Sequence, residues 1–263
     1  MYEIANGKVI FTTNYRGDFT LDDVDLKTFE ILEDKTLTAT DLAELTRKYI
    51  PYGWKKARYA AKDANSVWSS EVRIGDADAA SFEYFFGGQC SWGSDKNRAY
   101  CLYTEGKNRI KIINTVGKLR FFNEELGGYM RLHAYDEKYV YYCGRRLKGA
   151  ISSDCRFLIS NSVKSGDLTG IKYNDSFAMV SNGVVYRNGR QIEGSDGDTA
   201  EGYSISKPNQ GTLYIIVDRN NIYYEGKIFT EEVNRVLYSR IPPVIFGIQK
   251  VMQENRQLNK GVD

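Results

Sequence analysis

Along most of the chain, hydrophobic and polar residues alternate over short stretches that end at Asn, Asp or Gly. Residues 135–149 read YDEKYVYYCGRRLKG, with an Asp-containing turn, a VYY segment and a second turn at Gly144. A period of two is typical of β-strands, and Asn, Asp and Gly tolerate the backbone of tight hairpin turns. The pattern therefore predicts short antiparallel strands joined by hairpins.

Imperfect copies of this phrase recur along the chain. When they are aligned on their first polar turn residue, most have Val or Ile four places later, an aromatic residue five places later and Gly eight places later. The alignment residues, called anchors below, are Asp63, Asp95, Asp136, Ser181 and Asp218. Their spacing of 32 to 45 residues is typical of stacked supersecondary units. The copy at Asp63 has Glu71 in place of the Gly, and the copy at Asp95 diverges after Tyr100.

A second phrase recurs between these copies. Residues 25–32, 78–85 and 152–159 each place a Phe shortly after a polar turn. Residues 6–10, NGKVI, read as the end of a further unit. One unit is thus a meander of about three strands, which is marginal alone and gains a continuous core by stacking on its neighbours. We expect the paired tyrosines to be structural.

These patterns predict a mainly β protein whose repeated β-meander or hairpin units stack as an open array or a propeller-like sheet assembly. Residues 1–52 form an N-terminal β/α segment, which either stands alone or belongs to the first repeat. The repeat region covers residues 53–229, and residues 230–263 form a C-terminal helical cap.

Helical periodicity is confined to two places. Residues 38–51 begin with a Thr-x-x-Asp cap and stop at a proline, which predicts a short N-terminal helix. The C-terminal segment predicts helices broken at Pro242 and Pro243. The second of these places its apolar residues on one face, which we expect to cover the end of the array. These residues are Val244, Ile248, Val251 and Met252.

The phrases SDKNRAY, YDEKYVYYCGRRLKG and VDRNNIYYEGKIF, interleaved with DADAASFEYF, resemble the repeated motif of the DKNYY family of bacterial proteins. The resemblance extends over roughly residues 55–230. It implies a β-rich repeat protein with a role in recognition. The family has no established catalytic residues, so the resemblance transfers no active site to this chain.

The charge of the chain is balanced overall but uneven along its length. The net charge is +2, while residues 1–50 carry −4 and residues 101–150 carry +5. Such charged segments can orient a partner and speed its association. The predicted partner-binding residues are the acidic Asp18, Asp22, Asp23 and Asp25 and the basic Arg145, Arg146 and Lys148.

Little in the sequence supports catalysis, a cofactor or a metal. His133 is the sole histidine, and it lies inside the repeat pattern with no nucleophile motif nearby. Glu124 and Glu125 are adjacent and would point apart on a strand, which argues against a glycosidase pair. The four cysteines form no C-x-x-C pair, so we interpret them as reduced thiols. Residues 194–202, GSDGDTAEG, lack the pattern of a calcium loop, and we expect a flexible surface loop there.

By elimination, we predict a non-enzymatic recognition protein without a cofactor. The concrete hypothesis is an immunity protein that binds a cognate toxin domain and blocks it. The sequence shows no signal-peptide pattern and no apolar run of membrane-spanning length, which predicts a cytoplasmic protein. One alternative is a carbohydrate-active or carbohydrate-binding β-repeat protein. Another is a nucleic-acid binder that uses the basic stretch 107–148, with Phe121 and Tyr142 as stacking platforms. The sequence leaves the oligomeric state open.

Overall fold

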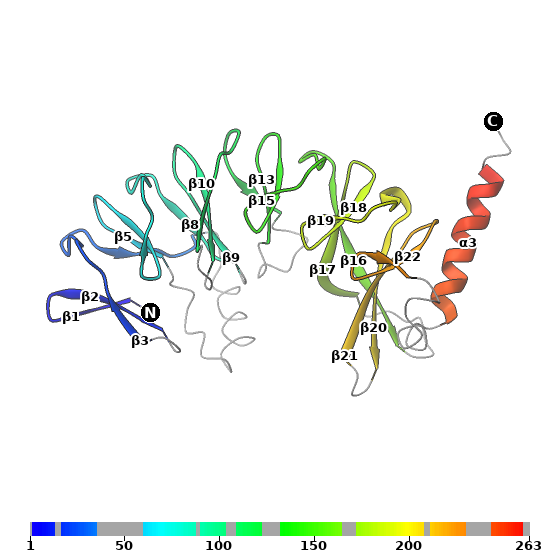
Figure 1. The fold of residues 1–263 in the computed structure, drawn as a ribbon, viewed down its shortest axis with the longest axis horizontal. Coiled ribbons are helices and arrows are strands. Elements are labelled where there is room, and N and C mark those ends of the chain that lie inside the picture. Colours follow the sequence, from blue (N-terminus) through cyan, green and yellow to red (C-terminus); the bar gives the residue numbers. More distant parts are fainter. Residues whose placement is uncertain are drawn as a thin grey trace. The chain divides into compact units, whose positions relative to one another are not determined.

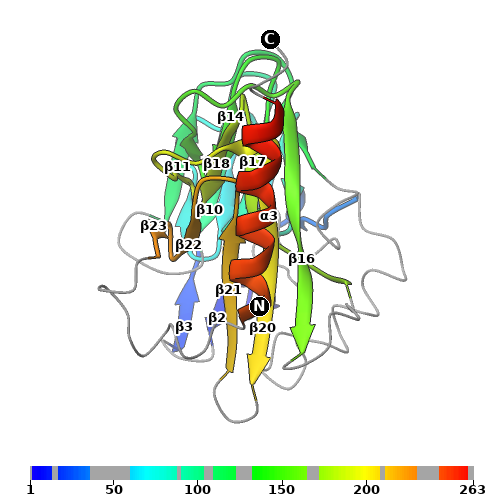
Figure 2. The ribbon, with the colours of Figure 1, turned by 90° about the vertical axis from the view of Figure 1, so that its right-hand side faces the viewer.

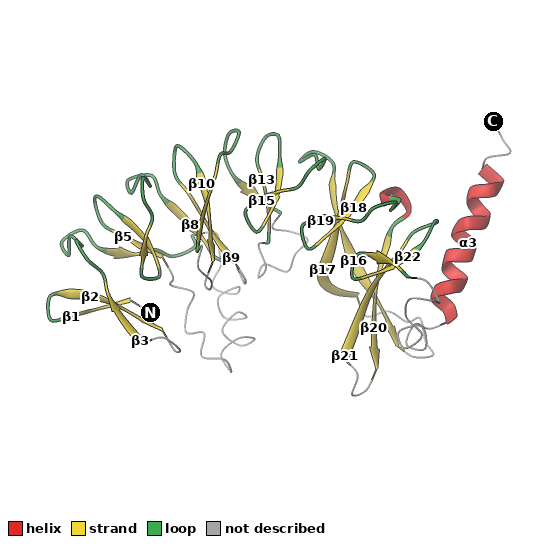
Figure 3. Cartoon of the chain, in the orientation of Figure 1, coloured by secondary structure: helices red, strands yellow, loops and turns green. Residues whose placement is uncertain are grey.

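In the computed structural model β-strands are the predominant secondary structure of the described residues, which confirms the predicted mainly β class (Figure 3). The described residues are 2–13, 17–35, 60–87, 90–103, 109–122, 132–164, 172–207, 211–229 and 243–259. The predicted helix at 38–51 and the first part of the predicted C-terminal cap lie outside these ranges.

The chain divides into two compact units (Figure 1). Unit 1 comprises residues 1–124 and 128–137, and unit 2 comprises residues 125–127 and 138–263. Repeats of the kind found in the sequence occur in both units. The division into residues 1–52, 53–229 and 230–263 stays a prediction.

Unit 1 contains three antiparallel sheets, in each of which consecutive strands are neighbours. The first sheet holds β1 (Tyr2–Ala5), β2 (Lys8–Thr13) and β3 (Gly17–Thr20). The second holds β4 (Glu30–Ile31), β5 (Ala60–Lys62), β6 (Val67–Ser69) and β7 (Val72–Arg73). The third holds β8 (Glu83–Phe85), β9 (Cys90–Ser94), β10 (Ala99–Tyr103) and β11 (Ile110–Ile113). β12 (Arg120–Phe121) pairs with β13 (His133–Tyr135) near the end of the unit.

Unit 2 begins with the hairpin of β14 (Val140–Tyr142) and β15 (Arg145–Arg146), and continues with an open eight-stranded sheet. The order of strands in this sheet is β19-β18-β17-β16-β20-β21-β22-β23, and only β16 and β20 pair in parallel. The strands are β16 (Cys155–Lys164), β17 (Lys172–Ser181), β18 (Val184–Arg187), β19 (Arg190–Gln191), β20 (Glu201–Lys207), β21 (Gly211–Val217), β22 (Ile222–Tyr224) and β23 (Lys227–Ile228). A 3-10 turn, η2 (Gly197–Thr199), precedes β20.

The hairpin turns explain the Gly that stands eight places after most anchors. At Asn188 and Gly189 both turn residues have positive φ, 49° and 73°, as a type I′ hairpin turn requires. The pairs Cys143–Gly144 and Glu225–Gly226 have the same backbone. Asn6 and Gly7 form another turn of this kind, and the residues that follow belong to β2. Residues 6–10 therefore begin a hairpin, whereas the sequence pattern predicted the end of a unit.

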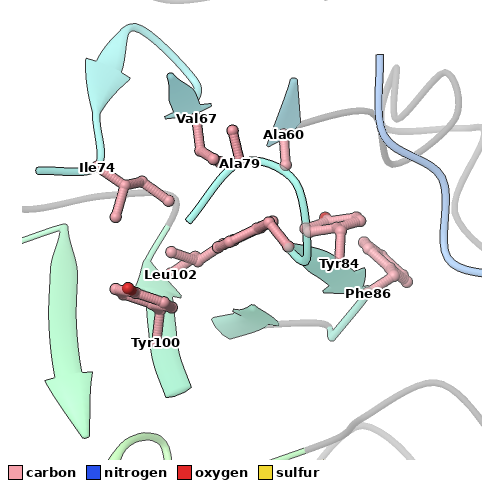
Figure 4. Close-up of a cluster of buried hydrophobic side chains, with 9 residues drawn as sticks. Ala60, Val67, Ile74, Ala79, Tyr84, Phe86, Tyr100 and Leu102 are labelled. Carbon is pink, nitrogen blue, oxygen red and sulfur yellow. The ribbon is translucent and has the colours of Figure 1, made fainter. Parts of the chain in front are cut away.

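Hydrophobic clusters lie between consecutive sheets of unit 1. The cluster between the second and third sheets contains Ala60, Val67, Ile74, Ala79, Phe82, Tyr84, Phe86, Tyr100 and Leu102 (Figure 4). The cluster between the first and second sheets contains Tyr2, Val9, Phe11, Leu21, Ala61 and Trp68. Neighbouring residues Val67 and Trp68 enter different clusters because successive side chains of a strand point to opposite faces. The second sheet is therefore buried on both faces, as a stacked repeat requires.

The same division holds in unit 2. Tyr223 packs with residues of β17 and β18, whereas the preceding Ile222 packs with residues of β20, β21 and the C-terminal helix. In both units the aromatic residue five places after the anchor thus faces the preceding repeat. The aliphatic residue four places after it faces the following one.

The helix α3 (Pro243–Asn259) packs against the last cluster of unit 2 (Figure 2). Ile245 is fully buried there, and Phe246, Ile248 and Met252 cover the cluster. Val251, which we expected on the same face, is 54% exposed. The reason is geometric, since residues 245, 248 and 252 follow the three-and-four spacing of one helix face and residue 251 falls beside it.

Candidate functional site

The anchor carboxylates form the centre of each repeat turn. At Asp95, Oδ1 accepts hydrogen bonds from the N–H groups of Asn97 (2.7 Å) and Arg98 (2.9 Å). Oδ2 accepts from the Asp78 N–H of the preceding loop (2.9 Å) and from the Tyr100 hydroxyl (2.7 Å). Burial opposes ionisation of Asp95, but these four hydrogen bonds outweigh it and hold its pKa below the ordinary value.

Asp218 repeats this arrangement in unit 2 while fully buried. Its Oδ1 accepts from the N–H groups of Asn220 and Asn221, both at 2.7 Å. Its Oδ2 accepts from the Asp196 N–H (2.7 Å) and the Tyr223 hydroxyl (2.9 Å). The carboxylate therefore closes its own turn with one oxygen and joins its repeat to the preceding one with the other.

All five anchors make the contact to the preceding loop. The donors and acceptors are Asp25 N–H to Asp63 (2.8 Å), Asp78 N–H to Asp95 (2.9 Å), Val116 N–H to Asp136 (2.8 Å), Ile151 N–H to Ser181 (2.8 Å) and Asp196 N–H to Asp218 (2.7 Å). At Ser181 a hydroxyl replaces the carboxylate. We call this contact the inter-repeat latch.

The residue after the anchor strengthens the latch. Lys96 forms an ion pair with Asp78, and its N–H donates to Ser81 Oγ (3.0 Å). The hydrogen bond from the Lys96 side chain lowers the pKa of the Asp78 carboxyl. Arg219 forms the equivalent pair with Asp196 in unit 2. The second recurring phrase of the sequence is therefore the partner of the first, one repeat earlier.

The tyrosines of the motif are also engaged by the scaffold. Tyr100 and Tyr223 are buried and donate to their anchors, and burial raises the pKa of both phenols. Tyr142, the second tyrosine of its pair, packs its ring over Gly189, where an added Cβ would lie 2.5 Å from Cδ1. The structure thus supports a structural role for the paired tyrosines.

The four predicted acidic partner-binding residues lie on and after β3 but differ in their surroundings. Asp18 on β3 is exposed, as are Asp22 and Asp23 in the following loop. Asp25 is half-buried and belongs to a latch, since its N–H donates to Asp63. Its own carboxylate accepts from the Lys27 N–H and the Thr28 hydroxyl. Asp25 is therefore part of the scaffold, while the other three face solvent.

The basic residues lie together in unit 2. Arg145 and Arg146 form the exposed strand β15, and Lys148 is exposed just after it. The Arg146 guanidinium lies 3.6 Å from the centroid of the Tyr139 ring, and the Lys138 ammonium lies 5.4 Å from it. Residues 138–148 carry four cations and no acid, so this hairpin is a small basic surface.

The rest of the basic stretch is dispersed. Arg109 forms an ion pair with Glu71, and Lys107 lies outside the described residues. Phe121 packs against Phe85 and Trp92, with ring centroids 4.8 and 6.0 Å apart. Since Tyr142 also packs on the scaffold, the aromatic rings expected to stack nucleic-acid bases already have protein neighbours.

The remaining candidates for chemistry have structural surroundings. His133 is buried on β13, and this burial lowers its pKa to about 4, so the ring is neutral at physiological pH. Cys90, Cys101, Cys143 and Cys155 all lie among the described residues and form no disulfide there. Within the described ranges, no three His, Cys, Asp or Glu side chains gather to hold a metal ion. Glu124 and Glu125 lie outside those ranges.

The segment 194–202, where we expected a flexible surface loop, contains η2 and the first residues of β20. Gly197 is buried and its N–H donates to the carbonyl oxygen of Gly183 (2.8 Å), while Asp196 contacts Asp218 and Arg219. Of the acids in this segment, Asp196 therefore takes part in the latch.

Two exposed cations lie outside the contiguous basic stretch and were therefore not predicted from the sequence. Arg190 on β19 and Lys227 on β23 stand nine places after their anchors, as Arg145 does. Comparing equivalent positions of the repeats, rather than contiguous stretches of charge, would have identified them.

The stacked sheets and their latches define a β-repeat protein in which residues at recurring positions of each repeat form the contacts between repeats. The chain belongs to the DKNYY family, whose family model matches residues 8–227. The match begins at β2 and so includes β2 and β3 of the first sheet, which lie outside the range 55–230 over which the sequence resembles the family. Comparison with curated proteins found no match, and neither did comparison with solved structures. Among the described residues, no helix has the length and hydrophobicity needed to cross a bilayer.

Proposed function

We propose that this chain is a non-enzymatic protein-recognition module, and specifically an immunity protein that binds a cognate toxin domain and blocks its active site. The observation that supports this proposal is that scaffold residues and exposed residues occupy different positions of each repeat. The motif residues are engaged in turns, latches and cores, whereas the exposed ends of the hairpins differ from repeat to repeat. These ends, of which Val72 alone is half-buried, read Val72–Arg73, Arg145–Arg146, Arg190–Gln191 and Lys227–Ile228. A constant scaffold with variable exposed positions suits recognition of a particular partner.

The basic hairpin of unit 2 is the best-supported docking point. Tyr and Arg are the residue types that most often dominate protein interfaces, and Tyr139 and Arg146 are already stacked on one another. Stacking limits the freedom of the arginine, so less conformational entropy is lost on binding. Exposed Arg145 and Lys148 add positive charge that attracts an acidic partner and raises its rate of association.

Two further features belong to the proposal. The repeats form an open array with α3 as its C-terminal cap, which is supported by the packing of Ile245 and its neighbours on the last cluster. The protein acts in the cytoplasm of the cell that makes the toxin, because an immunity protein must meet its partner there.

The test is a pull-down of the tagged chain from its native cell, followed by calorimetry with the purified partner. We expect one stoichiometric partner with a toxin domain, a one-to-one complex and loss of toxin activity in the complex. R145E/R146E should weaken the complex, while K111E/K118E, at exposed cations of unit 1, should not. A captured partner without toxin activity would contradict the immunity role. Binding of oligosaccharides or nucleic acid with no protein partner would contradict protein recognition altogether.

A further inference from the structure

Three consecutive hairpins of unit 2 carry a cation at the same position. Arg145, Arg190 and Lys227 each stand directly after the two-residue turn, on the short exposed strands β15, β19 and β23. In strand register they lie opposite Tyr142, Arg187 and Tyr224 respectively. We call these three cations the cation row.

Contacts between the hairpins place the row along one side of unit 2. The ring of Tyr142, from the first hairpin, packs over Gly189 in the turn of the second. The Arg187 guanidinium of the second hairpin forms an ion pair with Glu225 in the turn of the third, at 2.8 Å. Each turn therefore neighbours the next, and side chains at equivalent positions follow one another in the same direction.

The stability of its hairpin does not account for the second of these cations, Arg190. Arg190 lies opposite Arg187, and like charges on directly opposite strand residues are destabilising. Arg187 is buried and engaged by Glu225, whereas Arg190 is exposed. Within the part of the chain that the structure describes, none of the three cations of the row forms an ion pair.

We propose that the cation row is a docking surface for an acidic segment of a protein partner. The proposal rests on the recognition function above and names the surface and the charge of the partner. Three exposed cations in a row complement carboxylates spaced along a partner's surface, and such pairs contribute mainly to association rate and specificity.

Two observations favour an acidic protein over a nucleic acid. Acidic side chains accompany the row, since Glu193 is exposed three residues after Arg190 and Glu225 stands two residues before Lys227. They would repel the continuous negative charge of a phosphate backbone, whereas a protein surface can match charges of both signs. In addition, the ring of Tyr142 already packs on Gly189, whereas base stacking would need that ring as a platform.

The experiment compares R145E/R190E/K227E with K111E/K118E/R120E, which makes the same charge change at exposed cations of unit 1. The probes are a short fluorescent poly-glutamate peptide and an oligothymidine of equal charge, with dissociation constants measured by anisotropy. We expect the row variant to bind the peptide about tenfold more weakly than wild type, and the control variant to stay within about twofold of wild type. Far-UV circular dichroism checks that both variants are folded.

The possible outcomes distinguish a failure of the cation-row proposal from a failure of the proposed recognition function. Equal weakening by both variants would show a general charge effect and overturn the row. Tighter binding of oligothymidine than of the peptide would overturn the choice of a protein partner. If the native pull-down yields a partner that the row variant binds as well as wild type, the row is wrong and the recognition function stands. If no toxin is captured but peptide binding depends on the row, the row stands as a surface for acidic segments and the immunity role fails.

Discussion

Replacing Asp95 by alanine removes the acceptor of four hydrogen bonds at once. Two of the donors, the N–H groups of Asn97 and Arg98, lie in the turn itself, where water can replace the carboxylate. The other two, the Asp78 N–H and the hydroxyl of fully buried Tyr100, join the turn to the preceding loop and to the core. The loss of these two determines the expected effect.

The magnitude follows from the number and type of hydrogen bonds. At about 1.5 kcal/mol for each of two hydrogen bonds to a charged acceptor, Asp95→Ala should lower the free energy of unfolding of unit 1 by about 3 kcal/mol. Asp95→Asn keeps one acceptor but presents an amide nitrogen that cannot accept from Asp78, so we expect a loss of about 2 kcal/mol. Tyr100→Phe removes one of these two hydrogen bonds and should cost about 1.5 kcal/mol.

The assay uses urea unfolding followed by tryptophan fluorescence. All three tryptophans fall within residues 1–124, and Trp68 and Trp92 are buried in unit 1, so the signal reports that unit. Asp22→Ala, at an exposed acid of the same unit, is the control and should change stability by less than about 0.5 kcal/mol. An Asp95→Asn protein as stable as wild type would refute the latch. So would a larger loss for Tyr100→Phe than for Asp95→Ala.

The same carboxylate predicts an acid dependence. Burial raises the pKa of Asp95, but the four hydrogen bonds lower it by more, so the folded value lies below the ordinary 3.8. Because the folded pKa is depressed, the ionised carboxylate stabilises unit 1 above pH 3.8 and this contribution disappears as the pH falls through the folded pKa. In urea titrations at a series of acidic pH values, wild type should therefore lose stability more steeply than Asp95→Asn.

His133 and the turn glycines of unit 2 give two further predictions. Since burial lowers the pKa of His133 from 6.5 to about 4, the free energy of unfolding of unit 1 should fall as the pH drops from 6.5 toward 4. The full loss is about 3 kcal/mol; NMR titration of this single histidine checks the pKa, and a value near 6.5 would contradict the burial. Gly189→Ala adds a methyl 2.5 Å from Tyr142 at φ 73°, whereas Gly226→Ala, at the equivalent turn position with φ 78°, meets nothing within 4 Å. We expect losses of about 3 and about 1 kcal/mol respectively in urea unfolding followed by circular dichroism, and equal losses would disprove the packing of Tyr142 on that turn.

The local elements of the fold could be predicted because their causes are local. Turn residues such as Asn188 and Gly189 favour a left-handed backbone by their own chemistry, and strand alternation follows from the backbone. The repeated spacing then predicted stacked units, while the repeated phrases themselves carried the resemblance to the DKNYY family. The face of α3 was predicted only in part, because the contact of Ile245 with the β cluster, rather than hydrophobicity alone, decided that Val251 stays exposed.

The candidate site depended far more on contacts between distant residues. We predicted Asp25 as a partner-binding residue, but its N–H forms the latch to Asp63. This latch joins residues 38 positions apart, so no local pattern reveals it. Arg145 was found as part of a contiguous basic stretch, whereas Arg190 and Lys227 stand 45 and then 37 residues further along the chain. The sequence by itself determined the turns, the strands and the repeat period, because backbone preferences act over a few residues. Only the tertiary structure decided which charges remain exposed and which lie in a row, because that depends on how successive repeats stack.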